Sequence, residues 1–503
     1  MYTNLRREFF PMPRCIGDKN AASRPSASLA LVELCCSQSS EMAVYFRRLK
    51  QSRSLHGHTL VVETDSTMSG SPHVVIVGAG MGGATCAYYL RKELPGVTVT
   101  VLEARDRVGG RTKDITFWGS TVNMGAALFN TEQRNIAALA KELNLKIHCF
   151  KRSGDFPDNT IWDGREIVQT GKLLSIEPEA DAKMRQSLKE FLSALEATYQ
   201  KYDNGTFRSI PEFLAAGGLE AYTRQSVEEF FCDTPVSKRV QKYVIETVMR
   251  EFFGQGLESS VALAMICLAG VYQDAFKTEG GMSQLVKTLI ESSGCNLHLN
   301  SSVSLVRKME DQFEVWYSQR EAEPKLKISA DTIVIASPLE WAGIEFEGFI
   351  PAIVQPKREW ERVYMYVSKV AAKSIRKSYF KGVSLSPDNP SCIYTTSDAS
   401  QPWVALRSRD SSEGYNSYSI FHSEDIAEEG FLDQLFEGVR DFKSERWDYV
   451  HPVCPPVRGS DGYQSIILAD GLYYLNGLES VASQMEIAVV SGRNIARLIS
   501  KEL

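Results

Sequence analysis

Three glycines follow directly on a short apolar run near residue 75. The stretch "HVVIVGAGMGGATCAYYL" covers residues 73–90 and places Gly78, Gly80 and Gly83 in the spacing G-x-G-x-x-G. In such a turn the first glycine permits the tight bend, the second lets the backbone approach a pyrophosphate, and the third lets a helix pack closely. The start of that helix adds N–H groups and a positive dipole end. The pattern predicts a dinucleotide-binding turn.

An acidic residue stands twenty residues past the third glycine. Glu103 ends the predicted strand 97–102, where its carboxylate can accept from both ribose hydroxyls, and an acid there disfavours the 2′-phosphate of NADP. The following "EARDRVGGRT" offers a second glycine loop at Gly109 and Gly110, and a guanidinium, Arg111, for the far phosphate. Because NAD dehydrogenases do not need this second loop, the sequence favours FAD.

A third group of candidate residues lies near the C-terminus. Gly477 and Glu479 follow a predicted strand, and Met485 and Glu486 open a predicted helix. The N-terminus of a helix aimed at N1 and the C2 carbonyl of a flavin would stabilise the negative charge that reduction places there. We therefore expect both ends of the chain to hold FAD. Two further residues are expected to line the cofactor: Gly125 and Val303.

The elements around these residues indicate an α/β protein. The strand 74–77, the helix 84–92 and the strand 97–102 form a βαβ unit. Helical periodicity follows in 179–202 and 236–252, and "VALAMICLAGV" reads as a buried helix. Short strand-like pieces such as "RVYMYVSKV" and "WVALRSR" then suggest a second sheet. We expect a Rossmann-like FAD-binding domain of the glutathione-reductase or amine-oxidase type, with an inserted α+β substrate domain.

The predicted domains are discontinuous. The FAD-binding domain is expected to comprise residues 73–155, 272–340 and 455–503, and the substrate-binding domain residues 156–271 and 341–454. Residues 1–72 are rich in serine and arginine and show no sustained periodicity, so we expect a disordered N-terminal extension.

Composition and charge exclude several classes of function. The 503 residues are 43% hydrophobic and 23% charged, which is ordinary for a globular protein. The net charge of −6 is spread through the chain and offers no footprint for a nucleic acid. The apolar run 261–271 is shorter than the ~20 residues of a membrane-spanning helix. Ten cysteines form no C-x-x-C pair, and we expect no metal site.

Several stretches together resemble the flavin-containing amine oxidase superfamily: "VVIVGAGMGGATCAYYL", "VLEARDRVGGRT", "EGGMSQLVKTLI", "ADTIVIASPL" and "NGLESVASQMEIAVVSG". Within this superfamily, three further stretches are similar to the prenylcysteine oxidases, also called prenylcysteine lyases. They are "VMREFFGQ" at 248–255, the region from Trp447 to Pro456, and residues 465–488. The resemblance covers residues 73–503.

The resemblance implies an FAD-dependent oxidoreductase that cleaves the thioether of farnesyl- or geranylgeranyl-cysteine during the degradation of prenylated proteins. With molecular oxygen as acceptor, the products would be cysteine, a prenyl aldehyde and hydrogen peroxide. So amphiphilic a substrate requires an apolar tunnel with polar groups at one end. The helices at 179–252 and 261–271 are candidates for its wall.

The resemblance also points to the lysosome or another endomembrane compartment. Sequons at Asn204 ("NGT") and Asn300 ("NSS") would allow glycosylation on a secretory route. No signal peptide is visible, however, so a cytoplasmic location stays open.

Three residues are candidates for catalysis. Arg250 could bind the substrate carboxylate by two hydrogen bonds, although arginines more often form structural ion pairs. Arg362 falls where amine oxidases commonly carry a lysine that holds a water against the flavin, and a guanidinium does not replace an ammonium. His451, with Tyr449, could face the flavin, or could equally be a structural histidine. A further departure from the relatives is "GAALF", where Ala126 and Ala127 add methyl groups near the expected flavin ring.

Two other functions stay open. An amine or polyamine oxidase on the same scaffold would use the lysine that Arg362 replaces. A non-enzymatic prenyl-binding carrier that resembles Rab GDP-dissociation inhibitors would not need Glu103, the loop 109–111 or the helix at Met485. The presence of these three features favours the flavin enzyme over the carrier.

Overall fold

The computed structural model describes residues 62–63, 70–151, 155–319, 325–352, 362–382, 385, 391–426, 430–459 and 462–503. Thr59–Leu503 forms one compact unit, and a second unit, Met1–His58, lies outside the described residues. Within the predicted N-terminal extension, β1 (Val62–Glu63) pairs in parallel with β14 (Leu326–Ala330). The expectation of disorder for residues 1–61 and 64–69 concerns positions outside the described residues.

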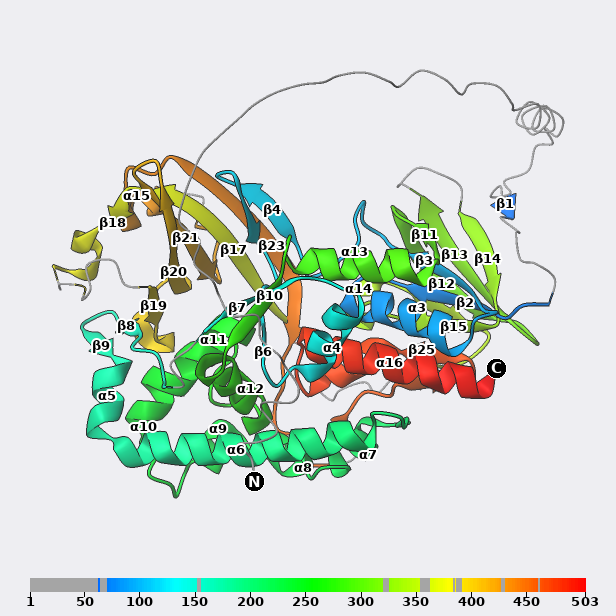
Figure 1. Ribbon diagram of the computed structural model, residues 1–503, viewed down its shortest axis with the longest axis horizontal. Coiled ribbons are helices and arrows are strands. Elements are labelled where there is room, and N and C mark those ends of the chain that lie inside the picture. Colours follow the sequence, from blue (N-terminus) through cyan, green and yellow to red (C-terminus); the bar gives the residue numbers. More distant parts are fainter. Residues whose placement is uncertain are drawn as a thin grey trace, which may run out of the picture. The chain divides into compact units, whose positions relative to one another are not determined.

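A six-stranded sheet carries the predicted dinucleotide turn (Figure 1). Its strand order is β11-β3-β2-β15-β25-β24. Its strands are β2 (His73–Val77), β3 (Thr98–Leu102), β11 (Asn296–His298), β15 (Thr332–Ile335), β24 (Ile467–Ala469) and β25 (Leu472–Tyr474). Because β2 runs parallel to both β3 and β15, the carboxyl ends of these strands meet at one edge. This arrangement confirms the predicted α/β class.

Helices cover this sheet, and two smaller sheets flank it. α3 (Met81–Glu93) contacts both α13 (Met282–Ser293) and α16 (Met485–Glu502), and the three lie side by side in Figure 1. One flanking sheet contains β12 (Ser301–Lys308), β13 (Phe313–Gln319), β16 (Glu345–Glu347) and the pair β1 and β14. The other contains β6 (Phe129–Asn130), β7 (Ile147–Phe150) and β10 (Ala275–Thr278).

A seven-stranded sheet forms the second large layer, in the order β23-β17-β21-β20-β19-β8-β9. Its strands are β8 (Thr160–Trp162), β9 (Ile167–Gln169), β17 (Arg362–Ala372), β19 (Cys392–Thr395), β20 (Trp403–Ser412), β21 (Tyr415–His422) and β23 (Asp441–Pro452). The second sheet expected from the strand-like pieces is therefore present. The domain boundaries proposed from the sequence stay a prediction.

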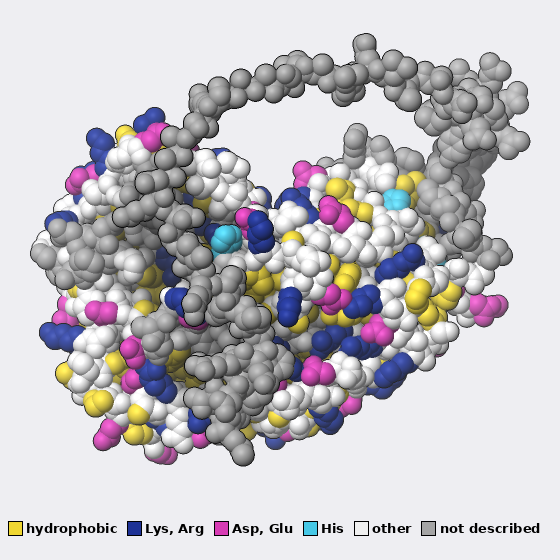
Figure 2. Space-filling model, viewed as in Figure 1, with side chains coloured by type: hydrophobic (Ala, Val, Ile, Leu, Met, Phe, Trp, Pro, Cys, Tyr) yellow, Lys and Arg dark blue, Asp and Glu magenta, His cyan; other side chains and the backbone are white. Residues whose placement is uncertain are grey.

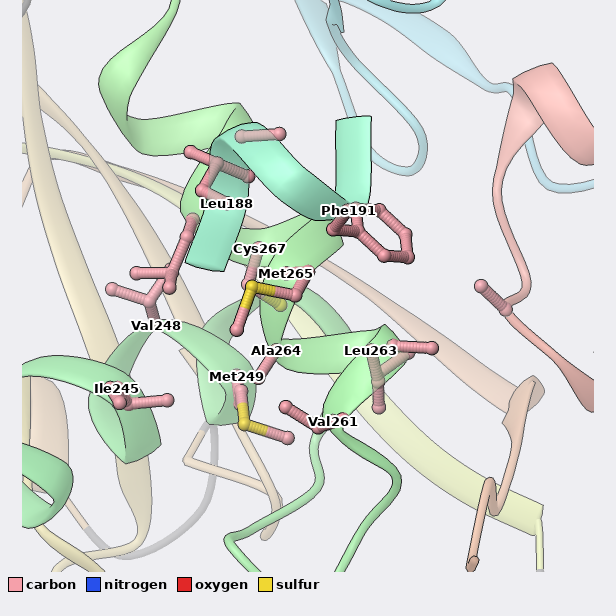
Figure 3. Close-up of a cluster of buried hydrophobic side chains, with 14 of the residues drawn as sticks. Leu188, Phe191, Ile245, Val248, Met249, Val261, Leu263, Ala264, Met265 and Cys267 are labelled. Carbon is pink, nitrogen blue, oxygen red and sulfur yellow. The ribbon is translucent and has the colours of Figure 1, made fainter. Parts of the chain in front are cut away.

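A layer of helices packs on the seven-stranded sheet. It includes α6 (Pro178–Lys201), α10 (Lys238–Val240), α11 (Thr247–Phe253) and α12 (Val261–Tyr272). Figure 3 shows apolar side chains of α6, α11 and α12 pointing toward one another. Ten of the twelve residues of α12 are buried, as its apolar sequence predicts. The helix expected at 236–252 is not one uniform α-helix, because a π-helical segment, η1 (Gln241–Glu246), separates α10 from α11.

Three further features of the described residues are the surface charges, the apolar character of the helices and the grouping of possible metal ligands. Figure 2 shows Lys and Arg side chains interspersed with Asp and Glu side chains on one face. None of the described helices combines the length and the apolar character that crossing a membrane requires. Within the same residues, no three His, Cys, Asp or Glu side chains are grouped so that they could hold a metal ion.

Candidate flavin site and active site

The turn between β2 and α3 has the geometry that its glycines predict. Gly78 has a φ of +111°, and a Cβ there would lie 2.9 Å from the carbonyl oxygen of Ala336. A Cβ on Gly83 would collide with the carbonyl oxygen of Gly78. The amide of Gly78 donates to the carbonyl of Leu102 at 2.8 Å, which ties the turn to the end of β3. The turn therefore depends on the absence of side chains at these two positions.

The second glycine loop packs directly on the first. Gly80 and Gly109 form a β-bridge, and the amide of Gly109 donates to the carbonyl of Ala79 at 2.9 Å. Gly110 has a φ of +55°, and a Cβ on it would lie 3.1 Å from the Cα of Gly80. Two glycine-rich segments, residues 78–83 and 109–110, thus pack against each other through their backbones. We call them together the glycine cradle. It fits a pyrophosphate, whose oxygens need close backbone N–H donors.

Glu103 lies buried beside this cradle, with 7% of its surface exposed. Its carboxylate accepts from the amides of Ala79 at 2.8 Å and Arg105 at 2.9 Å. The amide of Ser301 donates to the carbonyl of Glu103 at 2.8 Å, and Val303 follows two residues later on β12. The backbone at Glu103, just past the end of β3, is therefore hydrogen-bonded to the start of β12, the strand that carries Val303.

Arg111 joins the cradle to the C-terminal segment. Its guanidinium donates to the Glu479 carboxylate, to the hydroxyl of Ser483 at 2.8 Å and to the carbonyl of Val450 at 2.9 Å. Burial alone would lower the pKa of Arg111, but the Glu479 carboxylate outweighs it and raises that pKa. Most of the N–H donors of Arg111, which were predicted to bind the far phosphate, are therefore used in hydrogen bonds to other groups of the protein.

Gly477 lies close to Glu479 in the short helix η5 (Leu475–Ser480). A Cβ on Gly477 would lie 3.2 Å from the carbonyl oxygen of Ser465, and Asn476 donates to Glu479 at 2.7 Å. The structure therefore brings Arg111 to the segment that carries Gly477 and Glu479, more than 360 residues later in the sequence.

The N-terminus of α16 is open where a ligand is expected. Met485 begins the helix, and no side-chain hydrogen bond caps it. The preceding Gln484 instead accepts from the amide of the Gln133 side chain at 2.6 Å. The first-turn N–H groups and the positive dipole end of α16 are therefore available to a flavin.

Glu486, in the first turn of α16, accepts hydrogen bonds from the start of another helix. Its carboxylate accepts from the Asn135 amide at 3.0 Å, the Asn135 side chain at 2.7 Å and the Ile136 amide at 2.9 Å. These bonds cap α4 (Arg134–Glu142). Burial raises the pKa of Glu486. Its predicted contact with the cofactor stays a prediction, whereas its contact with α4 is a feature of the fold.

Gly125 accommodates a tryptophan from the seven-stranded sheet. A Cβ on Gly125 would collide with the carbonyl oxygen of Arg111 and would lie 3.2 Å from Cζ2 of Trp447. The indole N–H of Trp447 donates to the carbonyl of Met124 at 2.6 Å. Gly125 therefore lies between Arg111 of the second glycine loop and Trp447 of the seven-stranded sheet.

The three catalytic candidates lie on α11, β17 and β23. Arg250 donates to the backbone carbonyl of Thr395, and burial lowers the pKa of its guanidinium. His451 packs edge-on against Phe253, with ring centroids 4.9 Å apart. Arg362 pairs with Pro452 at the start of β17, and its side chain lies outside the described residues. The structure thus places Arg362 and His451 on adjacent strands, while their catalytic roles stay predictions.

Sequence reasoning missed several residues that build the site. The sequence pattern does not distinguish Arg105 within "EARDRVGG", and it gives no signal for Trp341 or Ser483. Arg105 lies between the rings of Trp341 and Trp447, with its Cζ 5.8 and 5.7 Å from their centroids. The one available signal was the position of Arg105 two residues past the ribose acid.

Comparison with known proteins extends these observations. Residues 168–503 match the family described as prenylcysteine lyase, and residues 76–143 match a NAD(P)-binding Rossmann-like domain. Farnesylcysteine lyase of Arabidopsis thaliana is 27% identical over 466 residues, which cover 87% of this chain and 89% of that protein. Prenylcysteine oxidase 1 of Rattus norvegicus is 25% identical over 464 residues, which cover 84% and 88%.

Two solved structures share the fold. Cyclohexylamine oxidase from Brevibacterium oxydans has a TM-score of 0.59 at 18% identity and covers 86% of this chain and 99% of that chain. Putrescine oxidase bound to putrescine has a TM-score of 0.60 at 17% identity and covers 85% and 99%. Together with the glycine cradle, Glu103 and the open end of α16, these findings confirm the expected FAD cofactor. The chain belongs to the prenylcysteine lyase family and is a flavoprotein oxidoreductase.

Proposed function

We propose that this protein is an FAD-dependent thioether oxidase that cleaves prenyl-L-cysteines, either farnesyl- or geranylgeranyl-cysteine. The observation that carries the proposal is the family match over residues 168–503, which include the helical layer and, apart from β8 and the first residue of β9, the seven-stranded sheet. The relatives named for farnesylcysteine and prenylcysteine span more than four fifths of the chain. In the proposed reaction one thioether, one O₂ and one water give cysteine, a prenyl aldehyde and hydrogen peroxide.

The chemistry sets clear tasks for the protein. FAD, when bound, supplies the acceptor for a hydride that leaves the prenyl carbon next to sulfur. The allylic double bond and the sulfur lone pair stabilise the cation left on that carbon, water adds to it, and the hemithioacetal collapses to cysteine and aldehyde. The residues of the chain must therefore hold the thioether in place, admit one water molecule and exclude the rest.

We assign the prenyl tail to a small pocket between α6 and α12 because much of its lining is apolar. Its apolar lining comes from Phe191, Leu192, Leu195, Ile266 and Ala269, and its polar lining from Asn130, Glu132, Gln133, Tyr199 and Gln484. Its cavity volume is about 20 Å³, well below the roughly 300–1,000 Å³ typical of ligand pockets, so α6 and α12 must move apart before a prenyl tail can enter. Because Gln484 immediately precedes α16, an apolar chain in this pocket would end near the helix that faces the flavin.

Polar groups for the amino-acid head are proposed where α11, β17 and β23 come together. Arg250 uses one guanidinium nitrogen for the carbonyl of Thr395, and its other N–H groups are the proposed donors to the carboxylate of the substrate. Arg362 and His451, on paired strands, are the candidates for positioning the attacking water. An Arg250→Lys variant should raise KM more than it lowers kcat if Arg250 binds the head group.

The decisive experiment follows the visible absorption band of the flavin in the purified protein without oxygen. Farnesylcysteine should bleach the band, and air should restore it with one peroxide formed for each aldehyde. Farnesol is the matched control, because it has the same tail without the thioether. Colourless protein that still binds farnesylcysteine would establish the carrier instead. Yellow protein that is bleached by amines alone would establish the amine oxidase.

The proposal includes a location in the lysosome or another endomembrane compartment. It is supported by the two sequons, since Asn204 and Asn300 are both exposed in the structure. Treatment of the cellular protein with an N-glycosidase should then lower its apparent mass, and Asn204→Gln and Asn300→Gln should remove that change. Unglycosylated protein in the soluble cytosolic fraction would establish the cytoplasmic alternative.

A further inference from the structure

Three arginines lie on the loop that follows Glu103, and the structure uses them differently. Arg111 is bound to Glu479, Ser483 and Val450, as described above. Arg107 donates to three backbone carbonyls, those of Gly110 at 2.9 Å and of Val108 and Thr112 at 3.3 Å. Among the described residues, the guanidinium of Arg105 has one hydrogen-bond acceptor, the carbonyl of Gly110, at 3.5 Å. Arg105 is therefore the guanidinium that keeps donors for a ligand.

Aromatic rings hold Arg105 without using those donors. Its guanidinium lies over Trp341 and Trp447, and Trp447 is itself fixed by its hydrogen bond to Met124. The ring of Trp341 packs on Tyr449 with centroids 4.9 Å apart, although 48% of Trp341 is exposed. A guanidinium that stacks on an aromatic face leaves the N–H groups at its edge free to bind. The rings therefore fix the orientation of Arg105 and leave its hydrogen-bonding capacity.

The position of Arg105 identifies the ligand. Its backbone amide donates to Glu103, the predicted partner of the ribose, and its side chain reaches Gly110 in the glycine cradle. Trp341 belongs to α14 (Leu339–Ala342), which starts three residues after Ala336, against which Gly78 packs. Both residues thus stand at the rim of the place where the ribose and diphosphate of FAD fit.

We propose that Arg105 binds the ribose-diphosphate part of FAD through the free edge of its guanidinium, and that Trp341 is the positioning residue that stacks Arg105 into place. The inference concerns retention of FAD and does not depend on which substrate the enzyme oxidises. Arg105 would supply a cationic contact to FAD that Arg111 supplies only in part, because most N–H donors of Arg111 are used by other groups of the protein.

The test measures how fast the purified holoenzyme loses FAD after dilution, followed by the rise of free-flavin fluorescence. Trp341→Ala should release FAD about 10-fold faster, which corresponds to a cation–π contact of ordinary strength. Trp341→Phe should restore most of the retention, because it keeps an aromatic face. Arg105→Ala should release FAD at least as fast as Trp341→Ala. Added salt should accelerate release from the wild type more than from Arg105→Ala, since that variant has lost the ion pair.

A second Arg–Trp pair provides a matched control. Arg307 lies over Trp316 at 5.7 Å in the flanking sheet, outside the cradle. Trp316→Ala should release FAD at the wild-type rate. The double variant Arg105→Ala/Trp341→Ala should release FAD no faster than Arg105→Ala, because Trp341 acts through Arg105. Release from Trp341→Ala within twofold of wild type, equal acceleration by Trp316→Ala, or additive effects in the double variant would each overturn the proposal.

Discussion

Single residues in this protein act largely through close backbone approaches. Gly83 lies at the start of α3, where any Cβ would meet the carbonyl of Gly78. We expect Gly83→Ala to lower the free energy of unfolding by about 1–3 kcal/mol, as overpacking does, and to lose FAD because the turn must shift. Flavin content and a denaturant titration measure both effects. Gly96→Ala is the control, since Gly96 is exposed and a Cβ there has no neighbour within 4 Å.

A buried histidine gives the protein an acid-sensitive position. Burial lowers the pKa of His422 to about 4, and its Nε2 lies 2.7 Å from the hydroxyl of Ser368. In the unfolded chain this histidine takes up a proton near its usual pKa of 6.5. Between these two values the unfolded state binds more protons than the folded state, so stability falls as the pH is lowered.

We therefore expect His422 to reduce the free energy of unfolding by about 3 kcal/mol between pH 6.5 and pH 4. Denaturant titrations at a series of pH values measure this slope. His422→Gln should flatten the profile in that window. The control His148→Gln changes an exposed histidine on β7 and should keep the wild-type slope. A His422→Gln profile as steep as that of the wild type would contradict the assignment.

Residues whose role is encoded within one short motif could be predicted from the sequence. The contacts of residues whose partners lie far away in the chain could not. Gly78, Gly83 and Glu103 could be assigned because a glycine turn and a strand-end acid are encoded within one short stretch. Glu486 and Arg111 were predicted only as contacts of the cofactor, whereas the partners that the structure gives them, Asn135 and Glu479, lie 351 and 368 residues away in the chain. No spacing rule connects such positions, so the capping of α4 became visible only in three dimensions.

At the scale of elements, α11, β17 and β23 meet where the catalytic candidates lie. α11 ends at Gly254, whose φ is +65° and whose Cβ, if present, would collide with Val363 on β17. Gln255 then donates to the carbonyl of Pro452 on β23 at 3.0 Å. The end of this helix is thus fitted closely against both strands.

This junction can be tested with two helix-ending glycines. Gly294 ends α13 with a φ of +62° and has no atom within 4 Å of an added Cβ. Gly294→Ala should cost about 1 kcal/mol of stability, the usual strain of a left-handed backbone. Gly254→Ala adds a collision with Val363, so we expect it to cost about 1–3 kcal/mol more and to lower activity. Equal losses in the two variants would show that α11 is not tightly seated on β17.

The sequence predicted the elements better than their irregularities. The apolar periodicity in 236–252 correctly indicated a buried helical face, since Val240, Val244 and Val248 within it are all buried. It did not indicate the π-helical turn η1, because apolar spacing reports which side is buried and not how the backbone bonds close. The apolar run of α12 was assigned correctly, since burial on nearly all sides needs no periodicity.

At the scale of the whole molecule, the flavin site joins segments from opposite ends of the chain. The glycine cradle and Glu103 come from the first third of the described unit, whereas Glu479 and the open end of α16 come from its last residues. A ligand that contacts both groups of segments links them and stabilises the folded state by mass action. We therefore expect the thermal midpoint to rise with FAD concentration.

The linkage predicts more than simple stabilisation. We expect the ribose-diphosphate of FAD at Glu103 and the glycine cradle, and its flavin ring at the N-terminus of α16. Because the two halves are covalently joined, FAD should raise the thermal midpoint more than an equimolar mixture of ADP and FMN, each of which must bind separately. Thermal unfolding of FAD-depleted protein with each addition measures the difference. Equal midpoints with FAD and with the mixture would show that the two ends of the chain are not bridged by one ligand, and would refute this arrangement of the site.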